Sequence, residues 1–280
     1  MRKIDKYITA FESYIEDHVI PDTNIVWFRR SVYLLMLLKM LLIWPELSMF
    51  YQHGVNLGKG SLLPYEVMFM PFFHNYYNLY WLFTSVIVAL ALFYKSNRWL
   101  AVAVFIISIT YLLLIFKAIN FGDMLLNFLI FMLIFIREGT QNGSVSQMVN
   151  NAVILIIQVH FCLLYLVNAL GKIMQPFWRD GSFFKNIWHL SYYANPNFIP
   201  DWFYHPTLNV VTAWTVILFE LIFPVLIWIK PYKRPLIIIG LLFHLGISLF
   251  LSLPDFGLAM ATVYLLFYDF KRNTQVSSAH

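Results

Sequence analysis

The sequence predicts an all-α fold, a polytopic transmembrane helical bundle with about eight spans. Of its 280 residues 60% are hydrophobic and only 12% are charged, whereas soluble domains average about 25% charged residues. The apolar residues gather in eight runs, and Lys and Arg are concentrated in some of the turns between them. One water-soluble core cannot bury so much apolar surface, so we expect the lipid bilayer to be the solvent.

The eight apolar runs are the predicted spans. They are Ser31–Met49, Trp81–Tyr94, Trp99–Lys117, Asp123–Ile136, Ala152–Lys172, Leu208–Ile229, Pro235–Leu253 and Gly257–Tyr268. A full crossing needs about 20 residues. The second, fourth and eighth runs are shorter, so they either gain length from aromatic flanks or lie inside the bundle. The turns Lys95–Arg98 and Lys230–Arg234 are too tight to hold a further domain, so we predict one membrane domain over residues 1–280.

The distribution of Lys and Arg predicts the orientation. Cations are frequent in the N-terminal segment, in the turns at 95–98, 137 and 230–234, and in the tail. Because Lys and Arg are retained on the cytoplasmic side, we expect both termini there, in a bacterial inner membrane. The aromatic loops Phe50–Tyr80 and Ile173–Pro206 then lie outside, and the second is expected to form short helices as a lid. No cleaved signal peptide is expected, since the first apolar run begins only near residue 31.

Residues 1–28 are predicted to form an interfacial amphipathic helix. Within them, apolar side chains share one face of the helix: Ile4, Ile8, Phe11, Ile15 and Val19. A helix of this pattern lies on the bilayer and anchors the chain to it.

Composition also excludes several kinds of function. The net charge of +5 is spread over loops without a basic stripe, so no nucleic-acid partner is predicted. The single cysteine, Cys162, excludes an internal disulfide and a CxxC redox motif. No metal site is predicted. The expected partners are the bilayer and either a peptide substrate or a membrane or periplasmic protein.

Ionisable residues inside the spans are the candidates for function, because burying them in lipid is costly. Lys39 is expected to snorkel or to pair with Glu46, and Asp123 to cap its helix. Glu220 is expected to be hydrogen-bonded or paired inside the bundle, with Lys39 or His244 as the candidate partners.

Helical periodicity gathers several of these polar residues on two spans. On the fifth span Gln158, Tyr165 and Lys172 fall within about 40° of one another, with Asn168 beside them and His160 at the margin. On the seventh span a stripe at i, i+4 spacing consists of Gly240, His244, Ser248 and Ser252. Each residue also has a structural interpretation: His160 as a helix-to-helix hydrogen bond, and Lys172 and Trp178 as interface anchors.

Several segments together resemble one family of membrane domains. They are YLVNALGK at 165–172, WRDG at 178–181, FELIFP at 219–224, FHLG at 243–246 and Phe256. In order and spacing they resemble the HTTM family, which includes the membrane domain of vitamin K-dependent gamma-glutamyl carboxylase and the maturation protein of the sporulation-delaying toxin. An arginine entering the first span, Arg29 or Arg30, fits as well, and the resemblance covers residues 25 to 270.

The resemblance to the carboxylase implies a chemistry and site residues. A reduced quinone, menaquinone or vitamin K hydroquinone, would react with oxygen and become the base that strips a proton from a glutamate side chain. The family's lysine base matches Lys172 and its intramembrane histidine matches His244. Around this catalytic pair we expect a pocket formed by Gln158, His160, Tyr165, Asn168, Trp178, Arg179, Asp180, Glu220 and Ser248.

The leading hypothesis is therefore a bacterial multi-pass membrane enzyme, resembling gamma-carboxylase, that modifies a peptide or lipid-borne substrate at the outer face. Lys172 and His244 are expected to converge on one cavity that opens outward. The rival hypothesis is a non-catalytic membrane subunit, or an assembly or immunity partner of a larger complex. A transporter is the third, because Pro45, Pro224 and Pro254 could break helices.

Overall fold

The chain forms two compact helical units, residues Met1–Asn151 and Ala152–His280. The computed structural model describes residues 20–48, 64–115, 119–190, 193–194 and 199–268, with the backbone alone for 64–74. Regular structure in these ranges is entirely helical. That residues 1–280 form one membrane domain stays a prediction.

Each of the eight apolar runs belongs to a helix. These helices are α2 (Asp22–Ile43), α4 (Pro64–Phe93), α5 (Arg98–Leu114), α6 (Phe121–Leu133), α7 (Val145–Met174), α10 (Pro206–Leu226), α11 (Lys230–Phe250) and α12 (Pro254–Phe267). Four are long and apolar enough to span a membrane: Asn75–Phe93 of α4, α7, α10 and α11. This indicates a membrane protein, while the crossing of the other four helices stays a prediction.

Two predicted boundaries were wrong. The predicted loop Phe50–Tyr80 is helical from Pro64 onward as part of α4, with non-helical backbone angles only at Tyr76. Proline fits the first turn of a helix, where its missing N–H is not needed. The helix α2 begins at Asp22, inside the predicted interfacial helix 1–28, with Pro21 at its N-cap and Asp22 in its first turn. Residues 1–19, which carry the predicted amphipathic face, lie outside the described residues.

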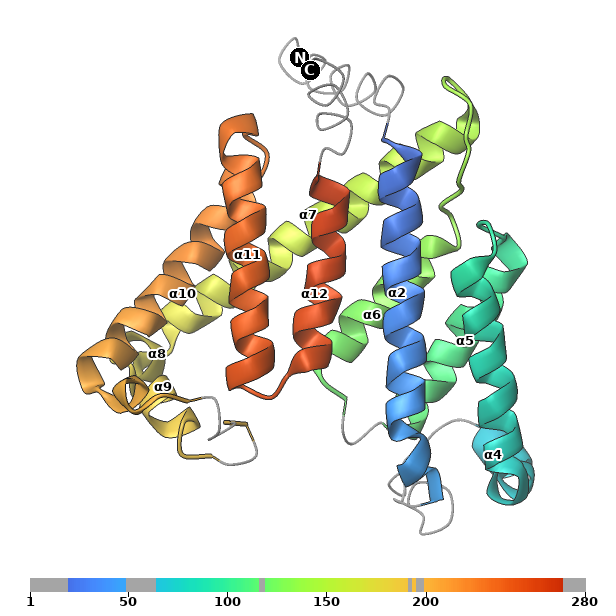
Figure 1. Cartoon of the computed structure of the whole chain (residues 1–280), viewed down its shortest axis with the longest axis horizontal. Helices are drawn as coiled ribbons and strands as arrows, with labels where there is room; N and C mark the ends of the chain where they lie inside the picture. Colours follow the sequence, from blue (N-terminus) through green and yellow to red (C-terminus); the bar gives the residue numbers. More distant parts are fainter. Residues whose placement is uncertain (1–19, 49–63, 116–118, 191–192, 195–198, 269–280) are drawn as a thin grey trace, which may run out of the picture. The chain divides into compact units, whose positions relative to one another are not determined.

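The first unit consists of α2, α4, α5 and α6, with α2 packed against α4 and α6, and α5 packed against α4 and α6 (Figure 1). Its core contains fully buried side chains from each helix: Phe28, Val32, Met40, Val88, Val104, Leu129 and Ile130. Two hydrogen bonds join polar groups of neighbouring helices here. Trp81 Nε1 donates to the Met40 carbonyl over 2.8 Å, and Ser108 Oγ donates to Asn127 Oδ1 over 2.7 Å.

A buried ion pair joins α2 to α6. Lys39 Nζ lies 2.6 Å from Asp123 Oδ1, and the two side chains are 10% and 2% exposed. Asp123 also completes a capping box with Asn120, accepting the backbone N–H of Asn120 over 3.0 Å. The prediction that Asp123 caps its helix is therefore confirmed, while Lys39 is paired within the unit instead of snorkelling.

The second unit contains α7 from Ala152 onward together with α10, α11 and α12. The closest packing is between α11 and α12, which run side by side (Figure 1). Two glycines permit it, because a Cβ at Gly240 would lie 2.0 Å from Tyr264 Oη, and one at Gly257 would lie 2.0 Å from Ser248 Oγ. The core of this unit is aromatic, with Phe161, Tyr165, Phe223, Tyr264 and Phe267 all buried.

The described residues of 176–204 form what we call the aromatic cap. They contain α8 (Pro176–Arg179), α9 (Ser182–Ile187) and the 3-10 helix η3 (Asp201–Tyr204), so the predicted short helices are confirmed. The buried rings of Phe184 and Trp188 pack against Ala213 of α10, with Phe250 at the end of α11 beside them. The cap therefore covers the start of α10 and the end of α11. Its position outside the cell stays a prediction.

One glycine fixes the cap to α10. Gly181 has φ +77°, and a Cβ there would lie 2.6 Å from the Val210 backbone nitrogen. Only glycine avoids both the backbone strain and this collision. Nearby, Trp188 Nε1 donates to Asn209 Oδ1 over 3.1 Å.

Candidate functional site

Lys172 and Glu220 form an ion pair in the second unit. Lys172 Nζ donates to both carboxylate oxygens of Glu220, each over 2.6 Å. The lysine side chain is 17% exposed and the glutamate side chain 8%. The ammonium also lies 4.9 Å from the centre of a Trp178 ring, which adds a cation–π contact. The ion pair is thus enclosed on the bundle side and partly open where α7 ends.

The helices explain why these groups meet. Lys172 is in the last turn of α7, where a cation complements the helix dipole. Glu220 is on α10, one turn before Pro224, which lies inside the helix. Because proline has no N–H, it cannot donate the usual helical hydrogen bond to the Glu220 carbonyl. Trp178 reaches Lys172 because α8 begins directly after α7 and turns the chain back.

A second polar cluster lies deeper in the same unit. The hydroxyl of Tyr165, on α7, lies 2.6 Å from His244 Nε2 on α11 and 2.5 Å from the hydroxyl of Tyr264 on α12. All three side chains are buried. A hydroxyl has one proton, so if Tyr165 donates to His244 it accepts from Tyr264. In that arrangement the histidine proton is on Nδ1, which has no hydrogen-bond partner among the described residues.

The two clusters lie near each other in the second unit. Lys172 and Tyr165 share a face of α7, and Phe219, which precedes Glu220 on α10, packs against Tyr165. The ring centres of Phe219 and Phe223 lie 5.8 and 4.4 Å from that of Tyr165. Apolar rings therefore pack around the buried Tyr165–His244 contact, beside the Lys172–Glu220 pair.

This arrangement can hold and move protons. An ammonium and a carboxylate in direct contact can exchange a proton and become a neutral amine and a carboxylic acid. Low polarity favours such neutralisation, because burying separate charges is costly. The neutral amine would be a general base, and the carboxylic acid a proton donor.

The residues leave little room for a quinone ring between the two clusters. His244 is 2% exposed, and its ring is surrounded by Phe256, Tyr165 and Tyr264 at centre distances of 5.7 to 6.1 Å. Glu220 already occupies two donor directions of the Lys172 ammonium. A quinone does not fit between these groups as they lie, so no step of the chemistry below involves one.

Four predicted pocket residues make other contacts. Gln158 Nε2 donates to the Leu266 carbonyl over 2.9 Å and so ties α7 to α12. Asn168 donates to the Leu164 carbonyl of its own helix, and Ser248 donates to the His244 carbonyl, each over 2.8 Å. His160 is half-buried and lies about 120° round α7 from Lys172. A place for these four residues in the pocket stays a prediction.

Arg179 and Asp180, which were predicted to line the pocket, hold the turn between α8 and α9. The Arg179 carbonyl accepts a hydrogen bond from Trp214 Nε1 over 3.1 Å. The Ser182 backbone N–H donates to Asp180 Oδ1 over 2.9 Å, and the Ser182 hydroxyl contacts the same oxygen. The Ser182 hydroxyl and N–H lower the pKa of the exposed Asp180 carboxyl from its ordinary value of 3.8. Both residues support the turn that carries Trp178.

The sequence reasoning missed Tyr264. Its hydroxyl completes the cluster around Tyr165, and its ring fills the space above Gly240. A signal for it was present, because Gly240 stands in the polar stripe of the seventh span and a glycine there admits a large side chain from a neighbouring helix. The sequence alone did not indicate which helix supplies that side chain.

Comparison with known proteins found no significant match. No protein-family model, no curated protein and no solved structure matches the chain significantly. The resemblance to the HTTM family therefore stays a prediction based on the quoted segments.

Proposed function

We propose that this protein is a multi-pass membrane enzyme that performs acid–base chemistry on a peptide or lipid-borne substrate at a membrane surface. The observation that carries the proposal is the Lys172–Glu220 ion pair, which is partly open at the end of α7 and backed by the buried Tyr165–His244 hydrogen bond. Lys172 is the base. Membership of the HTTM family would agree with this assignment.

In the proposed reaction the pair first exchanges a proton. Lys172 passes a proton to Glu220, which leaves a neutral amine and a carboxylic acid. The amine then takes a proton from the substrate and regains its charge, while the Glu220 acid returns a proton to the product or to water. His244 and Tyr165 act as positioning residues, because their side chains are enclosed and would not touch the substrate. The neutral state is accessible because the bundle interior disfavours separate charges.

The substrate is proposed to arrive from the outer surface. Lys and Arg are concentrated in the turns at the opposite end of the spans, which favours cytoplasmic termini. A reporter fused after His280 should then read cytoplasmic, and a tag inserted in the segment 195–201 should be accessible from outside. An external C-terminus would put Lys172 at the cytoplasmic surface and overturn this part of the proposal.

The function is tested by comparing products in a deletion strain of the native host. The strain is complemented with wild type, Lys172→Arg, Lys172→Ala or the exposed control Lys185→Arg. Lipids and secreted peptides are compared by mass spectrometry. We expect a mass change on one lipid or peptide with wild type and Lys185→Arg, and none with either Lys172 variant, because arginine keeps the charge but is not a base. A product made equally by Lys172→Arg, at equal protein level, would contradict the proposal.

The alternative is a non-catalytic subunit, and one observation favours it. Glu220 satisfies Lys172 with two hydrogen bonds, as expected of a purely structural ion pair. Exchanging the two residues, Lys172→Glu with Glu220→Lys, keeps opposite charges in contact but moves the amine to α10. Full function of this exchanged variant would favour the structural role, and loss of product in a folded protein would favour catalysis.

A further inference from the structure

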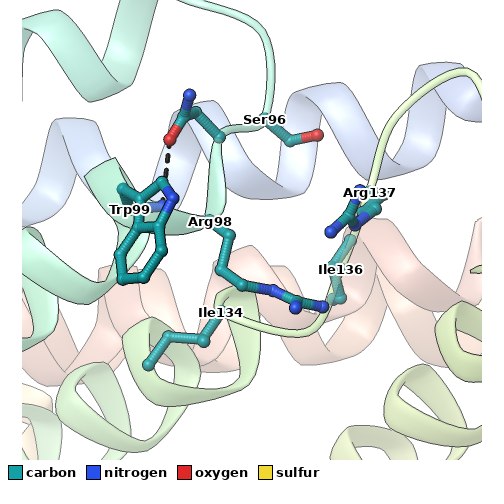
Figure 2. Close-up of a pocket in the computed structure, with 7 residues that line it drawn as sticks. Ser96, Arg98, Trp99, Ile134, Ile136 and Arg137 are labelled. Carbon is teal, nitrogen blue, oxygen red and sulfur yellow. Dashed lines mark hydrogen bonds between the residues drawn. The ribbon is translucent and has the colours of Figure 1, made fainter.

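A basic pocket lies in the first unit, far along the chain from Lys172. It is a cavity of about 330 Å³, at the low end of the range for small-molecule sites. Figure 2 shows its walls, which are formed by the turn between α4 and α5 and by the segment after α6. The lining residues are Ser96, Asn97, Arg98, Trp99, Ile134, Ile136 and Arg137. This lining contains two guanidinium groups and no acidic side chain.

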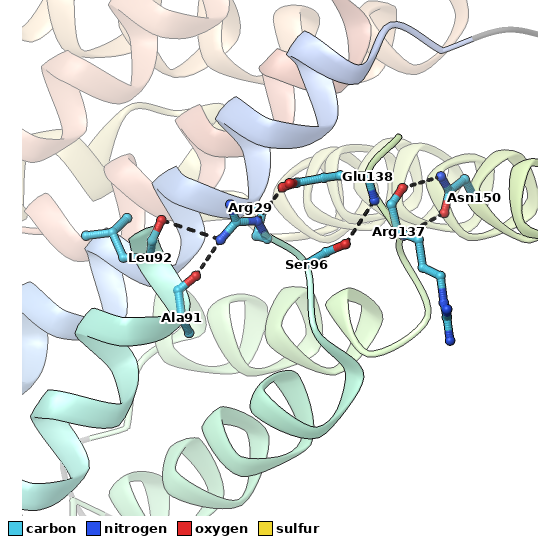
Figure 3. Close-up of polar contacts among 7 residues, drawn as sticks. All are labelled: Arg29, Ala91, Leu92, Ser96, Arg137, Glu138 and Asn150. Atoms are coloured by element: carbon cyan, nitrogen blue, oxygen red, sulfur yellow. Dashed lines mark hydrogen bonds and ion pairs between the residues drawn. The ribbon is translucent and has the colours of Figure 1, made fainter. Parts of the chain in front are cut away.

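The nearby acid is already neutralised by another arginine. Glu138 Oε1 lies 2.5 Å from Arg29 Nε, and Arg29 Nη1 also donates to the carbonyls of Ala91 and Leu92 (Figure 3). No ion pair involves Arg98 or Arg137 among the described side chains of residues 20–48, 75–115, 119–190, 193–194 and 199–268. The pocket therefore presents two positive charges that no described acidic side chain pairs with.

The walls of the pocket are held in place by hydrogen bonds. The Glu138 backbone N–H donates to Ser96 Oγ over 2.9 Å, which joins the two segments that form the pocket. The backbone of Arg137 is held on both sides by the buried Asn150: its N–H donates to Oδ1 over 2.9 Å and its carbonyl accepts from Nδ2 over 2.7 Å (Figure 3). Asn97 caps α5 by accepting from the Trp99 N–H over 2.9 Å. The arginine side chains thus project from a fixed frame.

The neighbourhood of the pocket indicates a lipid rather than a soluble ligand. The membrane-spanning part of α4 ends at Phe93, and the pocket begins three residues later at Ser96. Trp99 is 80% exposed, and Phe93 and Tyr94 are also largely exposed. Exposed aromatic rings at the end of a span lie at the level of lipid headgroups. A headgroup phosphate would meet Arg98 and Arg137 there, while its acyl chains remain beside Ile134.

We infer that this pocket binds the phosphate of an anionic phospholipid, held by Arg98 and Arg137. Guanidinium groups suit this ligand because their planar N–H fork matches the phosphate oxygens. The site is independent of the Lys172–Glu220 pair, so it can be tested without knowing the substrate.

The test uses the full chain in nanodiscs of phosphatidylcholine with a minor fraction of phosphatidylglycerol. Retained lipids are identified by native mass spectrometry after transfer to mild detergent. We compare wild type with Arg98→Gln/Arg137→Gln and with a control that removes two exposed charges elsewhere, Lys185→Gln/Lys230→Gln. Wild type and control should retain phosphatidylglycerol over phosphatidylcholine. The pocket variant should bind it roughly fivefold more weakly for each arginine removed.

Two further measurements make the result decisive. Phosphatidylglycerol should raise the Tm of wild type and of the control but not of the pocket variant, because only a folded state with the pocket binds the lipid. Arg98→Lys/Arg137→Lys should retain part of the preference, since charge remains without the fork. Equal lipid retention by the pocket variant would overturn the proposal. So would inorganic phosphate that, in lipid-free detergent, raises the wild-type Tm as much as the lipid does.

Discussion

Each unit contains a buried lysine–carboxylate pair with a 2.6 Å contact, and the two pairs differ in their surroundings. Asp123 is engaged on both sides, by Lys39 and by the capping box with Asn120, and is 2% exposed. Glu220 has no such cap, and its partner Lys172 is partly exposed beside a tryptophan. The first pair joins α2 to α6, while the second lies near the buried hydrogen bond between Tyr165 and His244.

The comparison shows why burial of an ion pair is weak support for function. An ion pair whose groups are also bonded to the surrounding protein stabilises the fold. Its removal therefore lowers the free energy of unfolding. A pair with an open side can change its proton state when a substrate replaces water there. The two pairs should therefore respond differently to the same kinds of substitution.

The largest loss of stability is expected for Asp123→Ala. It removes the Asp123 half of the capping box and breaks a buried ion pair from one side, which costs about 3–5 kcal/mol. The free energy of unfolding is measured in detergent by denaturant titration. The double variant Lys39→Met/Asp123→Asn keeps an acceptor for the Asn120 N–H and removes both charges of the pair, so it should lose less. If Asp123→Ala were as stable as this double variant, the pair would not be the structural joint described.

Glu220→Leu should cost less, about 2–3 kcal/mol, because it leaves a charged donor without its acceptor. The loss is smaller than at Asp123 since Lys172 is 17% exposed and its ammonium can turn toward water. Glu220→Gln, which still accepts a hydrogen bond, should keep the fold and lose less. Unfolding is followed as before, with Lys172→Met/Glu220→Leu as the control. A Leu variant as stable as wild type would mean that Glu220 contributes little to the bundle.

Gly240→Ala should destabilise the second unit by about 1–2 kcal/mol through overpacking. The added Cβ would meet Tyr264 Oη at 2.0 Å and displace the ring from Tyr165. Gly246→Ala on the same helix is the matched control, because its Cβ would lie 3.8 Å from the nearest atom, Phe250. That change should be neutral or slightly stabilising, since alanine favours helices. Equal effects at the two positions would argue against close packing at the Tyr264 hydroxyl.

The smallest effect concerns Asp180 and depends on pH. Because Ser182 lowers the pKa of this carboxyl in the folded state, its stabilisation is present at neutral pH. The stabilisation is lost as pH falls below the ordinary value of 3.8 and through the lowered pKa. Wild type should therefore have a slightly higher Tm than Ser182→Ala at neutral pH, and the two Tm values should converge in acid. A constant difference at all pH values would show that Ser182 acts without Asp180.

The fold was predictable where a single segment decided it. Runs of apolar residues indicated the helices, and the aromatic segment Ile173–Pro206 indicated short helices. The long α4 was missed because its aromatic residues from Pro64 were interpreted as a loop, although nothing there except the distortion at Tyr76 interrupts the helix. Contacts between different helices were harder to predict from the sequence. The cost of burying a carboxylate indicated that Glu220 must be paired, with Lys39 or His244 as the expected partner. Its actual partner, Lys172, depends on which helices are neighbours.

Because helix neighbours cannot be read from one segment, only part of the candidate site could be predicted from the sequence. Tyr165 and His244 were both expected in it from their helical faces, and their hydrogen bond agrees with that. Gln158 shares the face of Lys172 but contacts Leu266 instead, because residues on one face at different depths meet different neighbours. Tyr264 was missed because the sequence did not indicate which helix fills the space beside Gly240. These contacts depend on how far each helix is shifted along its neighbour, and no pattern within a single segment determines that shift.

The central claim is that the second pair acts chemically and the first does not. It is tested most directly by measuring product formation in the complemented strain for Lys39→Arg and Lys172→Arg. Each variant keeps a cation against its carboxylate and removes the amine that can act as a base. With both proteins folded and equally abundant, we predict normal product with Lys39→Arg and none with Lys172→Arg. Normal product from both variants would contradict the account and reduce the Lys172–Glu220 pair to a structural contact.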